Sequence, residues 1–203
     1  MTHVPPDGAL DRALAARYGL VAGVDEVGRG ALAGPVLVAA VIFDLDEALP
    51  DVDDSKRLSP RRREVLASQI RASALAWCVA RREADEIDRL NILEATRAAM
   101  EDAVLGLDPG PAVVVTDAMR LDRQRVPVLA EIGADRRFAS VAAASILAKV
   151  TRDRLMVELS ARWPVYAWAR NKGYSSQEHR LALAEFGVSP LHRKSFAPVR
   201  VLA

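Results

Sequence analysis

Cysteine is almost missing from this sequence of 203 residues: Cys78 is the only one, so no disulfide can form within the chain. Proteins of reducing compartments rarely depend on disulfides, and the composition fits such a compartment. Long hydrophobic runs are missing too, because the longest uncharged run, residues 31–43, falls short of the about 20 apolar residues that a membrane-spanning helix needs. Residues 1–11 lack the basic and apolar regions of a secretory signal. We therefore expect a cytoplasmic protein without a membrane segment.

Neither sign of charge dominates, since 28 Lys and Arg residues stand against 27 Asp and Glu residues. A protein that coats bare duplex is usually more basic, because Lys and Arg supply the contacts to phosphate. The balance still allows a nuclease whose acids gather at a metal site and whose basic residues line its rim. The sequence also lacks internal repeats, low-complexity tracts and linkers, so we expect one domain over residues 1–203.

The hydrophobic pattern predicts an α/β domain with a mixed central β-sheet flanked by helices. Runs of Val, Ile and Ala predict strands at residues 20–24, 36–43, 74–81 and 112–116. Helical patterns follow Ser59 and Asn91, which we expect to cap their helices, and recur over residues 141–162 and 176–186. We expect residues 1–18 to be a loose arm and residues 165–203 to form a small helical C-terminal part.

The most informative segment is residues 23–30, which read GVDEVGRG. Asp25 and Glu26 stand where an apolar strand gives way to glycines, and in α/β sheets sites tend to form outside strand ends. Gly28 and Gly30 leave the loop beside these acids without side chains, so its backbone N–H groups can approach a ligand closely. A turn with a surface Asp–Glu pair is the alternative, but the two glycines favour a functional site.

Two further acids follow the same rule: Asp117 ends the predicted strand 112–116, and Asp135 precedes another apolar stretch. Each alone could be a turn residue. Four acids at the ends of buried segments, without a Cys or His cluster, predict oxygen ligation of Mg²⁺ or Mn²⁺ and not of Zn²⁺. Two such ions about 3.5–4 Å apart can activate a water and stabilise the leaving oxygen in phosphodiester hydrolysis. Because neighbouring strand residues point to opposite faces, Asp25 and Glu26 share a site only if the strand is ending or if Glu26 uses a backbone oxygen.

The segment GVDEVGRG resembles the GxDExGRG signature of the ribonuclease HII family. The resemblance continues, in the family's order, in DSKRLS at residues 54–59, IDRLNIL at 87–93, AASILAKVTRD at 143–153, KGY at 172–174 and HRKSFAPV at 192–199. A lone glycine-flanked DE pair is weak evidence, but collinear blocks over most of the chain are strong evidence. The resemblance implies a ribonuclease H-like fold. It also implies an endonuclease that hydrolyses the RNA strand of RNA/DNA hybrids and nicks 5′ of single ribonucleotides embedded in duplex DNA, leaving 3′-hydroxyl and 5′-phosphate ends.

The resemblance also implies roles for individual residues. The catalytic, metal-binding carboxylates would be Asp25, Glu26, Asp117 and Asp135, with Mn²⁺ or Mg²⁺ as the cofactor and two ions in the active complex. The loop of Gly28, Arg29 and Gly30 would read the 2′-hydroxyl, which separates RNA from DNA and is exposed in a shallow minor groove. Tyr174 would stack on the neighbouring sugar; without the family, a core aromatic is the more natural interpretation.

Basic and polar residues complete the expected substrate surface. Lys56 follows a turn and could grip phosphate, whereas we interpret the run at residues 61–63 as a solvated helix start. Ser145, Lys149 and Arg152 fall on one helix face, which the resemblance turns towards the substrate. The cluster at residues 192–194 is either a duplex contact or a packing element of the C-terminal part. We expect His3 and His179 at the surface and Cys78 as a small buried residue.

Three positions depart from the family's pattern, and they bear on the fine geometry around the third and fourth acids. Ala118 stands where glycine is common, Gly133 where lysine is frequent, and Asn171 where histidine is frequent. Asp153 is a rival for the fourth ligand. We rank it lower because its spacing from Lys149 suits an ion pair within a helix.

The expected partners are RNA/DNA hybrids and duplex DNA that contains ribonucleotides. We expect a monomer that does not bind membranes, and leave open a contact with a sliding clamp or a polymerase. The alternative function is a non-catalytic hybrid-binding module of the same fold. Retained acids argue against that alternative, because uncompensated carboxylates near phosphates weaken binding unless metals neutralise them.

Overall fold

A five-stranded sheet with the strand order β3-β2-β1-β4-β5 forms the centre of the computed structural model, which describes residues 4–202. β1 (Val21–Val27), β2 (Val36–Phe43) and β3 (Ala74–Arg82) are antiparallel neighbours. β4 (Val113–Asp117) and β5 (Val128–Glu131) run parallel to β1. The mixed sheet confirms the predicted fold class.

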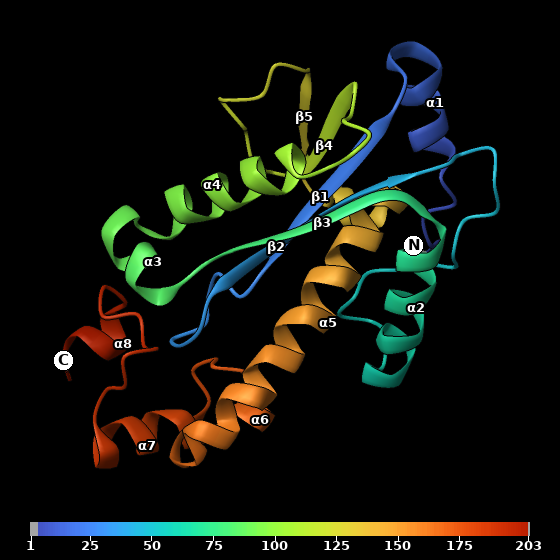
Figure 1. Ribbon diagram of the computed structural model, residues 1–203. Coiled ribbons are helices and arrows are strands. Elements are labelled where there is room, and N and C mark those ends of the chain that lie inside the picture. The colour runs from blue at the N-terminus through green and yellow to red at the C-terminus, as the bar shows by residue number, and fades with distance from the viewer. Residues whose placement is uncertain (1–3, 203) are drawn as a thin grey trace.

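Helices cover both faces of this sheet (Figure 1). α5 (Ala139–Arg162) crosses one face against β1 and β2, with α1 (Ala9–Tyr18) and α2 (Pro60–Ser73) on the same side. α4 (Ile92–Leu105) covers the other face, joined by α3 (Ala84–Leu90). The C-terminal part contains α6 (Trp168–Asn171), α7 (Gln177–Phe186) and α8 (Ala197–Arg200), so it is helical as expected. No helix among residues 4–202 is both long and apolar enough to cross a membrane.

Strand β2 is buried along its whole length because helices lie on both of its faces. Ala39, Val41 and Phe43 point into the core under α5 and α2. Val38, Ala40 and Ile42 point into the core under α4. This explains why the segment is continuously apolar rather than alternating.

Two residues that the sequence predicts as helix caps do cap their helices. The Ser59 side chain accepts the backbone N–H of Arg62 at 3.2 Å and so caps α2. The Asn91 side chain accepts the first backbone N–H groups of α4 in the same way. Both residues satisfy N–H groups that have no partner inside their helix, as predicted.

The N-terminal segment differs from the loose arm expected over residues 1–18, because Ala9–Tyr18 form α1. Asp11 of this helix is completely buried, and its carboxylate accepts the backbone N–H groups of Ala139 at 2.8 Å and Ser140 at 3.2 Å. These are the first N–H groups of α5, whose own N-cap residue, Phe138, makes no side-chain cap. A residue far away in sequence therefore caps the central helix.

Replacing Asp11 by alanine is expected to lower the free energy of unfolding by about 1–3 kcal/mol, because two buried N–H groups lose their acceptor. Asp11→Asn keeps one acceptor oxygen and removes a charge whose burial raises the pKa of Asp11, so this variant should be more stable than Asp11→Ala. Chemical denaturation of the three proteins measures both effects. An alanine variant as stable as the wild type would mean that α1 does not cap α5.

Candidate active site

Two carboxylates lie at the same level where the parallel strands β1 and β4 stop pairing. The last pair in the register joins Val24 to Thr116, so Asp25 and Asp117 follow side by side and point to the same face. That face packs against α5, because a Cβ on Gly23 would lie 2.2 Å from backbone atoms of α5. Asp25 is only 7% exposed. The register of the sheet thus brings together two acids that are far apart in sequence.

Electrostatics around Asp25 are unfavourable for an anion. Burial raises the pKa of Asp25 well above its ordinary value, and the charge of Glu26 raises it further. A hydrogen bond from Ser145 and one from the backbone N–H of Glu26 lower the pKa without cancelling these effects, and the charge of Asp117 adds to the rise. The folded chain therefore holds this carboxylate at a cost that a nearby cation would remove.

Glu26 approaches these acids although its side chain starts from the other face of the sheet. The expectation that β1 ends at this point is wrong on the side of β2, where Glu26 pairs with Val38 and the strand runs on to Val27. Beyond Val24, however, β4 no longer covers the other edge of β1. Burial raises the pKa of Glu26 and Asp117 raises it further, whereas the ion pair with Arg29 lowers it.

The two carboxylate oxygens of Glu26 have different surroundings. Oε2 is buried and has no hydrogen-bond partner among residues 4–202, while Oε1 accepts a hydrogen bond from Arg29 at 3.0 Å. A buried carboxylate oxygen without a donor is costly. A metal ion is a natural partner for such an oxygen, because carboxylates are preferred ligands of hard divalent cations.

The fourth acid, Asp135, reaches the group through the loop after β5. The backbone N–H of Gly133 donates to Asp117 at 2.7 Å, which holds the short 3₁₀ turn η1 (Ala134–Arg136) beside the end of β4. Asp135 is 5% exposed, and burial raises its pKa, as do the charges of Asp54 and Asp117. The structure thus connects all four predicted acids electrostatically.

Asp54 is an acid that the sequence reasoning did not single out, although it begins the DSKRLS block. It is buried, lies near Asp135, and accepts the backbone N–H of Lys56 at 2.9 Å. The next residue, Ser55, shares a hydrogen bond of 2.8 Å with Ser145 of α5. This loop therefore links Lys56, whose charge lowers the pKa of Asp135, to the group of acids.

The donor set fits a divalent cation in type and in charge, since it contains carboxylate oxygens and neither Cys nor His. Within residues 4–202, no three Asp, Glu, His or Cys side chains already converge as ligands of one ion. The acids are thus gathered, and the charge of each one makes ionisation of its neighbours less favourable.

The two glycines of the neighbouring loop differ in whether the packing of the protein requires them. Gly28 has a φ of 90°, and a Cβ there would lie 2.2 Å from the guanidinium of Arg152. Among the described residues, no atom lies within 4 Å of a Cβ position on Gly30, so packing within this part of the chain does not require glycine there. Arg29 between them is exposed. The surface at Gly30 is open to a ligand.

Tyr174 lies half-buried on the helix face that carries Lys149 and Arg152. Its ring centroid is 5.3 Å from the guanidinium carbon of Arg152 and 6.0 Å from Nζ of Lys149. Lys149 also pairs with Asp153 at 2.8 Å, which supports the ion-pair interpretation of that acid. Ser145 is 6% exposed and already engaged, and Arg152 is fully buried. The expectation that this whole face is open to the substrate is therefore wrong for Arg152.

Histidines behind Tyr174 form a buried chain of hydrogen bonds, so the expectation of a surface position is wrong for His179; His3 lies outside the described residues. Trp168 donates Nε1–H to Nε2 of His179, which leaves Nδ1–H of His179 to bind the carbonyl of Tyr174 at 3.0 Å. His192 lies 3.0 Å from the same Nε2 atom. Burial lowers the pKa of His192 to about 4, so both rings stay neutral at neutral pH.

The C-terminal cluster is mainly a packing element, the second of the two interpretations. His192 and Arg193 are buried, whereas Lys194 is exposed. Cys78 is only partly buried, contrary to the expected buried position, and its thiol would lie 2.5 Å from a Cβ on Gly106.

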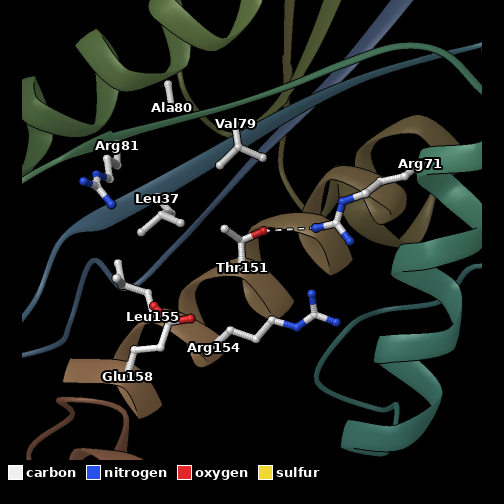
Figure 2. Close-up of a pocket in the computed structure, with 9 residues that line it drawn as sticks. All are labelled: Leu37, Arg71, Val79, Ala80, Arg81, Thr151, Arg154, Leu155 and Glu158. Carbon is white, nitrogen blue, oxygen red and sulfur yellow. Dashed lines mark hydrogen bonds between the residues drawn. The ribbon is translucent and has the colours of Figure 1, made fainter. Parts of the chain in front are cut away.

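The hollow shown in Figure 2 lies apart from these residues, between α5, α2 and the strands β2 and β3. Its volume is about 530 Å³, and it contains three arginines, Arg71, Arg81 and Arg154. Arg154 pairs with Glu64, and Arg81 pairs with Glu83 at 2.8 Å. Its charges are therefore largely compensated, unlike those of the acids.

Comparison with known proteins agrees with the resemblance seen in the sequence. The family model described as Ribonuclease HII matches residues 22–199. Ribonuclease HII of Ruegeria sp. (strain TM1040) is 50% identical over 196 residues, covering 96% of this chain and 85% of the relative. Ribonuclease HII of Geobacillus kaustophilus (strain HTA426) is 52% identical over 184 residues, covering 89% of this chain and 69% of the relative.

A solved structure agrees with these sequence comparisons. The crystal structure of ribonuclease H2 from Pyrococcus horikoshii OT3 superimposes with a TM-score of 0.80 at 29% identity, over 90% of this chain and 96% of that chain. This similarity confirms a ribonuclease H-like fold.

The departures from the family's pattern have visible backbone consequences. Ala118, directly after Asp117, has a φ of 56° in the left-handed region that favours glycine. Gly133 also lies in this region, with a φ of 70°, and donates to Asp117. Asn171 accepts the backbone N–H of Gly173 at 2.8 Å and so shapes the turn before Tyr174.

Ala118→Gly is expected to raise the free energy of unfolding by about 1 kcal/mol, because a side chain in the left-handed region costs about 1–2 kcal/mol and glycine loses part of this gain to its freer unfolded state. Gly133→Ala is the matched control and should lose a similar amount. Chemical denaturation measures both variants. A destabilised Ala118→Gly protein would contradict the argument.

Proposed function

Because this chain belongs to the ribonuclease HII family, we propose that it nicks 5′ of single ribonucleotides in duplex DNA as well as hydrolysing the RNA strand of RNA/DNA hybrids. Membership of the family makes it a metal-dependent ribonuclease and an endonuclease. The observation that carries the finer proposal is the group of buried and half-buried acids beside a loop whose Gly30 is open to a ligand.

We assign metal binding to the four acids at the ends of the strands and in η1, namely Asp25, Glu26, Asp117 and Asp135. These acids would hold two Mg²⁺ or Mn²⁺ ions, which would supply activation of a water and stabilisation of the leaving oxygen, so that cleavage would leave 3′-hydroxyl and 5′-phosphate ends. The chain contributes the four carboxylates and the groups that hold them in place. The backbone N–H of Gly133 donates to Asp117, and Ser145, which is hydrogen-bonded to Ser55, donates to Asp25.

Recognition of the ribose is assigned to Tyr174 and to the loop of Gly28, Arg29 and Gly30. A wide, shallow minor groove presents the 2′-hydroxyl, and backbone N–H groups of a glycine loop can reach it without obstruction by side chains. Lys56 and Lys149 border the acids and the tyrosine, where phosphates of the substrate would pass. The partner is therefore a hybrid or a duplex that contains ribonucleotides.

The non-catalytic module remains the second candidate, and the acids argue against it. Burial and mutual repulsion raise the pKa values of Asp25 and Glu26, so the folded chain is less stable than it would be without these charges. These destabilising acids would not help a module that only binds phosphates. Strong hybrid binding in EDTA that Asp25→Asn leaves unchanged, without cleavage by the wild type, would favour that module.

The decisive experiment is cleavage of a duplex with one embedded ribonucleotide, scored at nucleotide resolution with Mg²⁺ and with Mn²⁺. Asp25→Asn should lose cleavage, keep most of its hybrid binding, and unfold at a higher temperature than the wild type without metal. The last effect follows because a raised pKa means that the ionised carboxylate destabilises the fold at neutral pH.

Asp153→Asn is the matched control, since this acid pairs with Lys149 and lies outside the assigned metal ligands. We expect it to retain cleavage. A folded wild-type protein that leaves the substrate intact with both metals would refute the proposal, and loss of cleavage in Asp153→Asn would reassign the fourth ligand.

Tyr174→Phe removes the hydroxyl and keeps the ring on Arg152. The preference for cleavage at a single ribonucleotide over an RNA/DNA hybrid should fall about threefold to tenfold, the effect of one hydrogen bond of about 0.5–1.5 kcal/mol. The melting temperature should change little. Values of kcat/KM on the two substrates measure the preference, and an unchanged ratio would remove Tyr174 from ribose recognition.

A further inference from the structure

Two arginines lie fully buried beside the glycine loop without a carboxylate partner. Arg152 of α5 and Arg193 of the C-terminal part are both 0% exposed. Among residues 4–202, neither comes within ion-pair distance of an Asp or Glu. Buried charges are normally paired, because an unpaired one is expensive to desolvate. This pair therefore needs a physical explanation.

Both guanidinium groups hold the backbone that follows the acid-bearing strand. Arg152 donates to the carbonyls of Ala33 at 3.1 Å and Pro35 at 3.0 Å. Arg193 donates to the carbonyls of Arg29 at 2.8 Å and Gly34 at 3.0 Å. The carbonyl of Arg29 belongs to the glycine loop itself. The buried guanidinium groups of Arg152 and Arg193 therefore fix the path of the loop backbone from the interior of the protein.

Arg152 also connects this loop to Tyr174. Its guanidinium packs on the ring of Tyr174 and donates to the carbonyl of Lys172 at 2.8 Å, two residues before it. Gly28 packs on the same guanidinium, since a Cβ there would collide with it. A single side chain therefore sets the distance between the two elements that we assign to ribose recognition.

Positive charge is in excess at this place. Nη2 of Arg193 is buried and has no hydrogen-bond partner in the part of the chain that the structure describes. Burial and the charge of Arg152 lower the pKa of Arg193 to about 9, whereas Tyr174 and Asp88 raise it. The charge of Asp153 likewise raises the pKa of Arg152. Within residues 4–202, however, neither Asp153 nor Asp88 lies within ion-pair distance of these two arginines. An anion bound at the loop would offset this repulsion, because buried charges are screened less than exposed ones.

We propose that Arg152 and Arg193 are positioning residues for ribonucleotide recognition, which hold the Gly28–Gly30 loop against Tyr174 and attract the substrate phosphate next to the recognised ribose. The proposal rests on the proposed function and deepens it. Its two parts are separable, because geometry depends on the planar fork of arginine, whereas attraction depends only on charge.

Substitutions can separate these parts. Arg152→Lys and Arg193→Lys keep an amino group that can donate hydrogen bonds, but this group does not span two or three carbonyls in fixed directions. Each should lower the preference for a single ribonucleotide over an RNA/DNA hybrid about tenfold, as expected for lost hydrogen bonds to a charged group. Arg152→Met keeps the bulk without the charge. It should also reduce the salt dependence of substrate binding by up to about one unit in the slope of log K against log salt.

Arg154→Met is the matched control, because this arginine of the same helix is exposed in the hollow of Figure 2 and pairs with Glu64. It should leave the preference unchanged. Thermal melting of every variant identifies any that fail to fold. The folded lysine variants then decide, because they remove the planar fork and keep a hydrogen-bond donor.

The outcomes distinguish this inference from the proposed function. Folded lysine variants that keep the wild-type preference, or that lose both activities equally, would overturn the positioning role. An unchanged salt slope in Arg152→Met would overturn the attraction of phosphate. If the wild-type protein fails to cut at single ribonucleotides, the proposed function fails before these variants are compared.

Discussion

The parallel pairing of β1 with β4 is the constraint on which the candidate site depends. It sets Asp25 level with Asp117, and a slip of one residue would turn one of the two carboxylates to the opposite face of the sheet. Gly23 allows α5 to approach β1 so closely that no side chain fits between them, which places Ser145 beside Asp25. Backbone hydrogen bonds and helix packing therefore hold together acids that repel one another. The stability of the rest of the fold offsets the unfavourable electrostatic energy of these acids.

The same region keeps charges of opposite sign in neighbouring but separate places. Carboxylates gather at the strand ends, and the buried Arg152 and Arg193 stand under the glycine loop without pairing to them. Direct ion pairs would have made both groups more stable, so their separation is a cost to the free protein. In the proposed function, a substrate that brings phosphates, together with divalent cations, would neutralise both groups at once. Such local destabilisation is what is expected where function and stability make different demands on a sequence.

Much of this arrangement could be predicted from local patterns, because strands, caps and strand-end acids have signals within a few residues. Ser59 and Asn91 cap their helices as predicted, and Asp25 and Asp117 stand where apolar runs end. The remaining features depend on contacts between distant segments. Asp11 and His179 resemble surface residues in sequence, and only the packing of α1 and α7 buries them. Short or half-exposed elements such as β5 and α3 lack a strong hydrophobic period, and so they were missed.

Glycines of the recognition loop show how a single motif can satisfy two different demands. Gly28 is required by the protein, since its positive φ and the guanidinium of Arg152 leave no place for a side chain. Gly30 has free space around it, so its lack of a side chain has no cause in the packing of the described chain. Because packing among the described residues does not explain the missing side chain at Gly30, what approaches from outside explains it best. The motif therefore combines one glycine that the packing of the loop requires with one that leaves open space where we propose the sugar binds.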